Sequence, residues 1–241
     1  MAGPLSSRFS RWGVPPEPVV LSDRARRHLD RLVGAPRPRP AVEVADVVVP
    51  PSTAPEALLA ALRAVVGDEH VQTDRASRLG GVVGSSLTDL ARRRSGQVPH
   101  APDVVVAPAT HEQVAAVLTT AVRERAAVVT LGGGTSVVGG VVMDRGGLES
   151  VVALSTHRMI DIGDVDPVSC LVTVGPGVTG PMLERLLQAR GFTLGHYPQS
   201  WELASIGGYV ATRSAGQASS CLLYTSPSPR DRTRSRMPSS A

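Results

Sequence analysis

The chain has 241 residues and a mass of 25.1 kDa, and its 42% hydrophobic content is enough for a folded core and argues against disorder throughout. Its formal charge is +4, and all 25 basic residues are Arg because the sequence contains no Lys. The missing lysine excludes a Walker phosphate loop, a pyridoxal Schiff base and a lysine nucleophile, and the 3% aromatic content argues against a surface that stacks nucleic-acid bases.

Residues 1–97 are predicted to form a helical lead-in rather than a catalytic domain. Ser22 is expected to cap a short helix that ends near Gly34, and consecutive valines predict a strand at 47–49. Apolar residues at helical spacing predict an amphipathic helix at 55–66.

From residue 98 the pattern changes to alternating strands and helices, which indicates a mixed α/β (α+β) fold. Strands are expected at residues 103–107, 127–131, 150–154, 159–162 and 171–174, and helices at 110–125 and 181–190. Thr110 is a plausible N-cap for the first of these helices, and Gly191 follows the second, as glycine often does at a helix C-terminus. We take 98–220 as one domain.

The last 21 residues, 221–241, differ in composition from the rest. After Cys221 they contain five Ser, three Pro and four Arg with no apolar period, so they cannot bury enough surface to offset the entropy lost on ordering. This predicts a disordered tail, and a basic targeting tail is the alternative.

The number of cysteines and the hydropathy of the sequence indicate the cellular compartment of the protein. Cys170 and Cys221 are too few for a disulfide framework or a four-ligand zinc site, and no stretch approaches the ~18 apolar residues of a membrane-spanning helix. We therefore expect a cytoplasmic protein without a transmembrane segment, a metal site or a nucleic-acid partner. Whether the chain forms a homodimer is left open.

The strongest chemical signal is a glycine-rich loop, 130–140, directly after a predicted strand. Its five glycines let the backbone turn with positive φ and aim several N–H groups at one ligand, which is how a protein binds a diphosphate without a cation. Thr135 and Ser136 add hydroxyl donors. The alternative is a tight turn that lets strands pack closely.

A second loop, 175–180, matches the Gly-x-Gly-x-x-Gly pattern between a strand and a helix. Pro176 removes a backbone donor where the phosphate of a dinucleotide would lie, and no second βαβ unit follows. We therefore favour a turn that leads into a helix with Thr179 as its N-cap.

Four motifs occur in order: the loop 132–140, the helix 179–190 with the residues 191–196 that follow, the run Gln199–Ser205, and the run Ile206–Gly216. Together they resemble the FAD-binding domain of the p-cresol methylhydroxylase (PCMH) and vanillyl-alcohol oxidase superfamily. Its alkyldihydroxyacetonephosphate synthase-like branch also shares Arg11-Trp12-Gly13 and a segment around 87–96. The resemblance covers most of residues 8–220.

The resemblance implies three segments that bind FAD, the first of which grips the diphosphate with backbone N–H groups. The implied cofactor-binding residues are Thr130, Leu131, Gly132, Gly133, Gly134, Thr135, Ser136 and Val137, then Gln199, Ser200, Trp201, Glu202, Leu203, Ala204 and Ser205, and then Thr212, Arg213, Ser214 and Ala215. No catalytic residue is assigned to this chain.

Several positions depart from the family pattern or bear on how FAD is bound. Gln199 stands where the family often has an acidic residue, and Ser214-Ala215 reverses the usual Ala-Ser order. Thr135 stands where relatives with covalent flavin have His, and threonine cannot form that bond, so non-covalent FAD is expected. For Arg213, an ion pair with a carboxylate and a contact with flavin are equally open.

For the complete protein, the resemblance implies FAD-dependent exchange of an acyl group on dihydroxyacetone phosphate for a long-chain alcohol. The alternative within the superfamily is a D-lactate or glycolate type 2-hydroxyacid dehydrogenase. The family's flavin domain continues beyond Gly216 and is followed by a cap domain with the catalytic residues. We therefore expect the chain to be incomplete at its C-terminal end, with 221–241 foreign to the fold, and a non-catalytic or unstable fragment is a third hypothesis.

Overall fold

The structure, a computed structural model, describes residues 9–10, 21–34 and 40–216. The Arg11-Trp12-Gly13 motif and the predicted tail 221–241 lie outside the described residues. The chain forms two compact units, Met1–Met159 and Ile160–Ala241. The domain boundaries taken from the sequence, 1–97, 98–220 and 221–241, stay a prediction.

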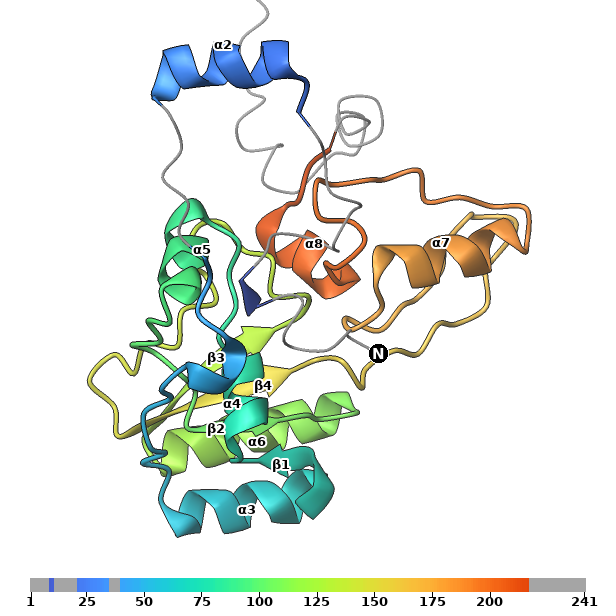
Figure 1. The fold of residues 1–241 in the computed structure, drawn as a ribbon. Coiled ribbons are helices and arrows are strands. Elements are labelled where there is room, and N and C mark those ends of the chain that lie inside the picture. Colours follow the sequence, from blue (N-terminus) through green and yellow to red (C-terminus); the bar gives the residue numbers. More distant parts are fainter. Residues whose placement is uncertain (1–8, 11–20, 35–39, 217–241) are drawn as a thin grey trace, which may run out of the picture. The chain divides into compact units, whose positions relative to one another are not determined.

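The helices and strands are shown in chain order in Figure 1. They are α2 (Asp23–Val33), the 3₁₀ turn η1 (Val44–Asp46), α3 (Glu56–Val66), the 3₁₀ turn η2 (Asp68–His70), β1 (Val71–Gln72), α4 (Arg75–Gly80), α5 (Leu87–Arg94), β2 (Val104–Val106), α6 (His111–Arg123), β3 (Ala126–Leu131), β4 (Ser150–Ser155), α7 (Gly180–Gln188) and α8 (Ile206–Thr212).

The first unit contains a four-stranded sheet in the order β1-β2-β4-β3. Strands β2, β4 and β3 are parallel, with Val104 opposite Val152 and Ala126 opposite Ser150, and β1 pairs antiparallel to β2. Strand β4 therefore lies between the two strands that precede it in sequence. It is buried on both faces, as its nearly continuous apolar sequence requires.

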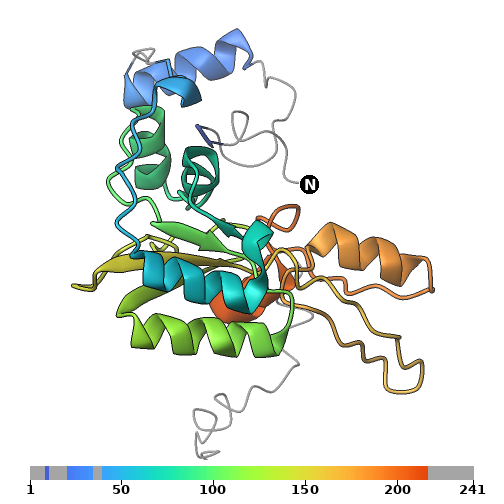
Figure 2. The same ribbon diagram turned by 90° about the horizontal axis from the view of Figure 1, so that it is seen from below.

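The two faces of this sheet carry separate apolar clusters. Helices α3 and α6 cover one face (Figure 2), where Val152 and Leu154 of β4 pack against Leu58, Leu62 and Val117 of the helices. The alternate residues of β4 point to the opposite face and join a cluster with Leu131 and Met143. This alternation fixes the register, because a shift by one residue would exchange the two faces.

In the second unit, α7 packs its apolar face into a cluster of its own that includes Val178, Leu183 and Leu187. Gly180 begins α7 at a point of close backbone approach, where an added Cβ would lie 2.7 Å from the carbonyl oxygen of Trp201. Thr179 is the N-cap residue of α7, although its side chain makes no capping hydrogen bond. The second glycine loop is thus the predicted turn into a helix.

Most predicted elements are confirmed, with boundaries shifted by one or two residues at most positions. The strand predicted at 47–49 is wrong, because these residues follow η1 without a strand partner and Val47 instead packs with Leu79 and Val98. The strands predicted at 159–162 and 171–174 meet only at single bridges, Ile162 with Val174 and Asp166 with Leu171. Of the helices in the described ranges, none combines the length and the apolar character needed to cross a bilayer.

Candidate functional site

The first candidate segment begins where β3 ends, in the first unit. Leu131 closes the strand, and the chain turns through Gly134, whose φ is +69°. The carbonyl oxygen of Gly134 accepts a hydrogen bond from the backbone N–H of Gly84 at 2.9 Å, and that of Ser136 accepts one from Ser85 at 2.7 Å. Two carbonyls of the loop are thus held by an earlier segment of the chain.

Several backbone N–H groups of the same loop, in contrast to these carbonyls, are without a hydrogen-bond partner in the part of the chain that the structure describes. Among the described residues, the backbone N–H groups of Gly134, Thr135, Ser136 and Val137 donate no hydrogen bond. Four adjacent donors without an acceptor, in a loop in which the carbonyls of Gly134 and Ser136 are already paired, form a concavity of the kind that binds anions. The loop therefore fits a diphosphate without help from a charged side chain.

Hydroxyl groups supplement this backbone arrangement. The Ser136 Oγ accepts hydrogen bonds from the N–H groups of Val138 at 3.4 Å and Gly140 at 3.2 Å, which shapes the second half of the loop. Because a hydroxyl can accept and donate together, its hydrogen can still be given to a ligand oxygen.

A titratable group follows β4 at the same carboxyl end of the sheet. The N–H of Thr156 donates to the carbonyl of Leu131 at 2.9 Å, and the next residue, His157, lies with its Nδ1 2.8 Å from the Oγ of Ser155. Partial burial, followed by the charges of Arg158 and His70, lowers the pKa of His157 below its usual 6.5. His157 is therefore neutral at pH 7 and supplies no fixed positive charge.

The second and third candidate segments lie in the second unit, at opposite ends of α8. Ser205 is the N-cap of this helix, and its Oγ accepts the N–H of Gly208 at 3.2 Å. Thr212 ends the helix, and its Oγ1 lies 2.8 Å from the Oγ of Ser214. These two segments thus flank one helix of the second unit, and the first segment belongs to the other unit.

Two contacts join the residues just before the second segment to the third segment and the residue after it. Pro198 forms an antiparallel bridge with Gly216, and the Nε2 of His196 lies 3.0 Å from the carbonyl oxygen of Ser214. If Nε2 carries the proton, it donates to this carbonyl. This imidazole then fixes the backbone of the third segment.

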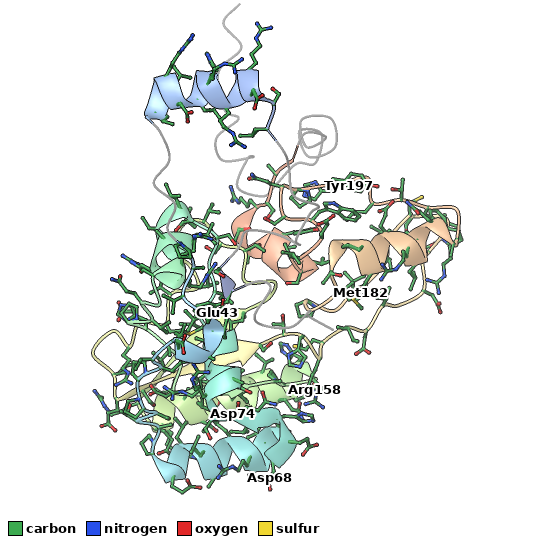
Figure 3. The ribbon with its side chains drawn as sticks, viewed as in Figure 1. Glu43, Asp68, Asp74, Arg158, Met182 and Tyr197 are labelled. Carbon is green, nitrogen blue, oxygen red and sulfur yellow. The ribbon has the colours of Figure 1, made fainter. Side chains whose placement is uncertain are left out.

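The side chains of these segments differ in how firmly they are held. Trp201 is half-buried and contacts Tyr197, which is labelled in Figure 3, edge to face at a ring-centroid distance of 5.2 Å. Gln199, Glu202 and Arg213 are exposed. Within the described part of the chain Arg213 makes no ion pair, so nothing there favours the carboxylate alternative for this residue.

The sequence analysis missed the residues that hold the first segment. Gly84 and Ser85 carry no motif of their own, because their contribution is made by backbone N–H groups. The signal that marks their place is Ser86-x-x-Asp89, a capping box that starts α5 directly after them. No group of three or more His, Cys, Asp and Glu side chains that could hold a metal ion occurs in the ranges 9–10, 21–34 and 40–216.

A family model described as an FAD binding domain matches residues 102–222, which is just over half of the chain. The chain belongs to this family of FAD-binding domains. The match contains all three candidate segments, and it begins after the residues that hold the first of them.

The similar proteins agree with this assignment. Alkyldihydroxyacetonephosphate synthase of Dictyostelium discoideum is 33% identical over 181 residues, which are 75% of this chain and 29% of the relative. Glycolate oxidase subunit GlcD of Escherichia coli is 36% identical over 123 residues, or 51% of this chain and 23% of the relative. The chain thus spans less than a third of these curated relatives.

Solved structures give the same result. A structure of alkyldihydroxyacetonephosphate synthase superposes with a TM-score of 0.73 at 30% identity and covers 82% of this chain and 38% of that one. For p-cresol methylhydroxylase the TM-score is 0.53 at 20% identity, over 67% of this chain and 30% of that one, which is a likeness of fold. The fold is therefore a PCMH-type FAD-binding fold, its cofactor is FAD, and the relatives include alkyldihydroxyacetonephosphate synthases.

Proposed function

We propose that residues 130–137, 199–205 and 212–215 bind FAD, and that the first of these segments holds its diphosphate. The observation that carries this proposal is the pattern of backbone hydrogen bonds in the first loop. The carbonyl oxygens of Gly134 and Ser136, which would repel a phosphate, are paired with Gly84 and Ser85, and four neighbouring N–H groups have no acceptor among the described residues.

The roles of the chain's residues follow from this arrangement. The backbone of the first loop binds and orients the diphosphate, and the hydroxyl of Thr135 adds a donor. The two segments of the second unit hold the rest of the dinucleotide, with His196 fixing the third. Once bound, FAD supplies the redox-active and electrophilic ring system that protein side chains lack.

For the whole protein we propose the alkyldihydroxyacetonephosphate synthase type of activity, the exchange of an acyl group on dihydroxyacetone phosphate for a long-chain alcohol. Its support is the similarity to synthases over 75% of this chain. The substrate would then be a small lipid-like phosphate ester. A cytoplasmic location and the lack of a nucleic-acid partner are carried by the sequence alone and stay predictions, and a homodimer is neither predicted nor excluded.

The test of cofactor binding is a fluorescence titration of the 241-residue chain with FAD, with ADP as a competitor that shares the diphosphate. Thr135→Asp should weaken both ligands about tenfold or more, because like charges about 4 Å apart repel by about 1 kcal/mol in water and about 4 near a protein surface. Val138→Asp, at a position that is 83% exposed in the same loop, adds the same charge as a control.

Unchanged FAD affinity in Thr135→Asp would overturn the assignment of the diphosphate to this loop, and a wild-type chain that does not bind FAD would overturn the proposal as a whole. The mode of attachment is tested by acid precipitation. We expect all yellow colour to leave the protein with the supernatant, because Thr135 cannot bond covalently to the flavin ring. Colour retained by the pellet would contradict this.

A 2-hydroxyacid dehydrogenase is the second candidate, favoured by the similarity to glycolate oxidase subunit GlcD. The two activities differ in their effect on bound flavin. A dehydrogenase substrate must leave electrons on the flavin, whereas exchange of an acyl for an alkyl group gives no net oxidation. In the complete protein, anaerobic addition of D-lactate or glycolate should therefore leave the absorbance of the flavin near 450 nm unchanged, and bleaching would favour the dehydrogenase.

A further inference from the structure

A short segment outside the matched family region is hydrogen-bonded to the first candidate segment, residues 130–137, which we call the diphosphate loop. We call residues 83–86 the brace segment. Two backbone hydrogen bonds join it to the loop, from the N–H of Gly84 to the carbonyl of Gly134 at 2.9 Å and from the N–H of Ser85 to that of Ser136 at 2.7 Å. The family match begins at residue 102, so the brace segment lies before it.

Neither the loop nor the brace segment tolerates a side chain at its glycine, the loop because it approaches the brace segment and the brace segment because it approaches α5. A Cβ added at Gly134 would lie 2.8 Å from the Cβ of Val83, and Gly134 has a φ of +69°. A Cβ added at Gly84, whose φ is +105°, would lie 2.6 Å from the Oδ2 of Asp89. Both positions need glycine for backbone conformation and for space.

The brace segment is itself held by α5. Ser86 and Asp89 form a capping box, in which the Asp89 N–H donates to the Ser86 Oγ at 3.1 Å and the Ser86 N–H donates to the Asp89 Oδ2 at 3.2 Å. One turn further along the helix, the Nη1 of Arg93 donates to the carbonyl oxygen of Gly84 at 2.6 Å. Arg93 therefore acts on the residue that pairs with Gly134.

Arg93 is unusual in its burial. Its residue is 6% exposed, and its Nε donates a second hydrogen bond, to the carbonyl oxygen of Phe9 at 2.7 Å. Burying a guanidinium is unfavourable unless its donors are satisfied, so the geometry of these two bonds is strongly constrained. The neighbouring Arg92 is exposed.

We propose that Arg93 is a positioning residue for diphosphate binding. By fixing the carbonyl of Gly84, it aligns the N–H groups of Gly84 and Ser85 with the carbonyls of Gly134 and Ser136. Those carbonyls then stay turned toward the brace segment, and the loop's N–H groups stay available to the diphosphate. The ligand class is a dinucleotide diphosphate, and the inference rests on the proposed FAD-binding function.

The test uses Arg93→Lys in the full chain, with Arg92→Lys as the matched control on the same helix. Lysine keeps the charge but is a point donor that cannot reproduce the fork between the two carbonyls. A hydrogen bond to a charged group contributes about 1.5–3 kcal/mol, so the affinity for FAD and for ADP should fall about tenfold or more in Arg93→Lys. Arg92→Lys should bind both ligands like the wild type.

Amide hydrogen exchange without ligand supplies a readout that a general loss of stability would not reproduce. In Arg93→Lys the amides of Gly84 and Ser85, which donate to the loop carbonyls, should exchange faster by about tenfold, whereas those of β4 should exchange at the wild-type rate, since local opening is independent of global unfolding. Equal acceleration in β4 would mean that Arg93 only stabilises the unit as a whole and would overturn the inference.

The exchange experiment also separates this inference from the proposed function. A wild-type chain that fails to bind FAD contradicts the proposed function, and the exchange rates of the Gly84 and Ser85 amides still decide whether Arg93 holds the contact with the loop. A chain that binds FAD with the same affinity in wild type and Arg93→Lys, with unchanged exchange at Gly84 and Ser85, contradicts the inference alone. Should Arg93→Lys not fold, Ser86→Ala, which removes the capping box, should weaken ligand binding and speed the exchange of the Gly84 and Ser85 amides in the same way.

Discussion

The Oδ2 of Asp103 accepts a hydrogen bond from the backbone N–H of Val151 at 2.8 Å, which ties the residue before β2 to the second residue of β4. The other carboxylate oxygen accepts from the Nη2 of Arg145 at 2.8 Å and from the N–H of Thr53 at 2.9 Å. Asp103 is fully buried, and its charge is balanced by these donors and by Arg145. One carboxylate therefore joins four separate stretches of the chain at the amino end of the parallel strands.

We expect Asp103→Ala to lower the free energy of unfolding by about 3 kcal/mol or more, because it leaves the buried N–H of Val151 and the partly buried donors of Thr53 and Arg145 without their partner. Urea unfolding followed by circular dichroism measures this loss. Glu149→Ala is the control, since Glu149 lies just before β4 but is exposed. A midpoint for Asp103→Ala equal to that of the control would show that the carboxylate is not a structural clamp.

A second buried carboxylate stabilises the other unit. Glu184 of α7 accepts hydrogen bonds from the hydroxyl of Thr193, from the side chain of Gln188 at 3.1 Å and from the N–H of Leu194 at 3.2 Å. Burial by itself would raise the pKa of Glu184, but the hydrogen bonds outweigh it and hold the pKa below the usual 4.5. The ionised form of Glu184 is thus favoured by the fold.

The lowered pKa of Glu184 makes the stability of the fold decrease at acidic pH. Because the pKa of Glu184 is lower in the folded chain than in the unfolded chain, its contribution is complete above about pH 4.5 and is lost as the pH falls through the folded pKa. Glu184→Gln should cost about 1–2 kcal/mol at pH 7 and should lose less stability than the wild type on acidification. Urea unfolding at pH 7, 5 and 4 measures both, with Asp161→Asn, an exposed position, as control. Parallel pH profiles for wild type and Glu184→Gln would contradict the assignment.

Elements with a strong period could be predicted from the sequence, because burial of one face dictates the spacing of apolar residues. Leu58 and Leu62 in α3 and Val117 in α6 are examples, and each is 0% exposed. Sheet order could not be predicted, since the alternation of residues reports faces and not neighbours. The placement of β4 between β2 and β3 is set by pairing across the sheet.

The same limit applies to the candidate site. The glycine loop was predicted because free backbone N–H groups require glycine and small polar residues in sequence. Its support was not, because the bonds from Gly84 and Ser85 to the loop join backbone groups of residues about fifty positions apart, and such bonds impose no side-chain pattern. Arg93 carries a charge that is common on helix surfaces, and only its burial distinguishes it.

The close approach at Gly180 predicts a strong effect of a small substitution. In Gly180→Ala the new methyl group would meet the Tyr209 hydroxyl and the carbonyl oxygen of Trp201, which are held by their own hydrogen bond and cannot easily move. Overpacking of this kind costs about 1–3 kcal/mol. Thermal or urea unfolding measures it, with Gly163→Ala as control, because nothing lies nearer than 3.4 Å to a Cβ there. A Gly180→Ala chain as stable as the control would show that the segment after α7 adjusts freely.

The buried hydroxyl of Tyr209 predicts that the stability of the fold falls at alkaline pH. The absence of lysine makes this fall easy to observe. Its hydroxyl donates to the carbonyl oxygen of Trp201 at 3.1 Å, and burial raises the pKa of Tyr209 to about 12. Because the folded pKa exceeds the usual value of 10.0, the contribution of Tyr209 is complete below pH 10 and is lost as the pH rises toward about 12.

Tyr209→Phe should cost about 1 kcal/mol at pH 7 and should abolish this part of the alkaline decline, so its deficit relative to wild type shrinks above pH 10. Tyr197→Phe, at a residue that is 40% exposed, should keep the decline. Since no lysine titrates in this range, a constant deficit of Tyr209→Phe from pH 8 to pH 11.5 would contradict the prediction directly.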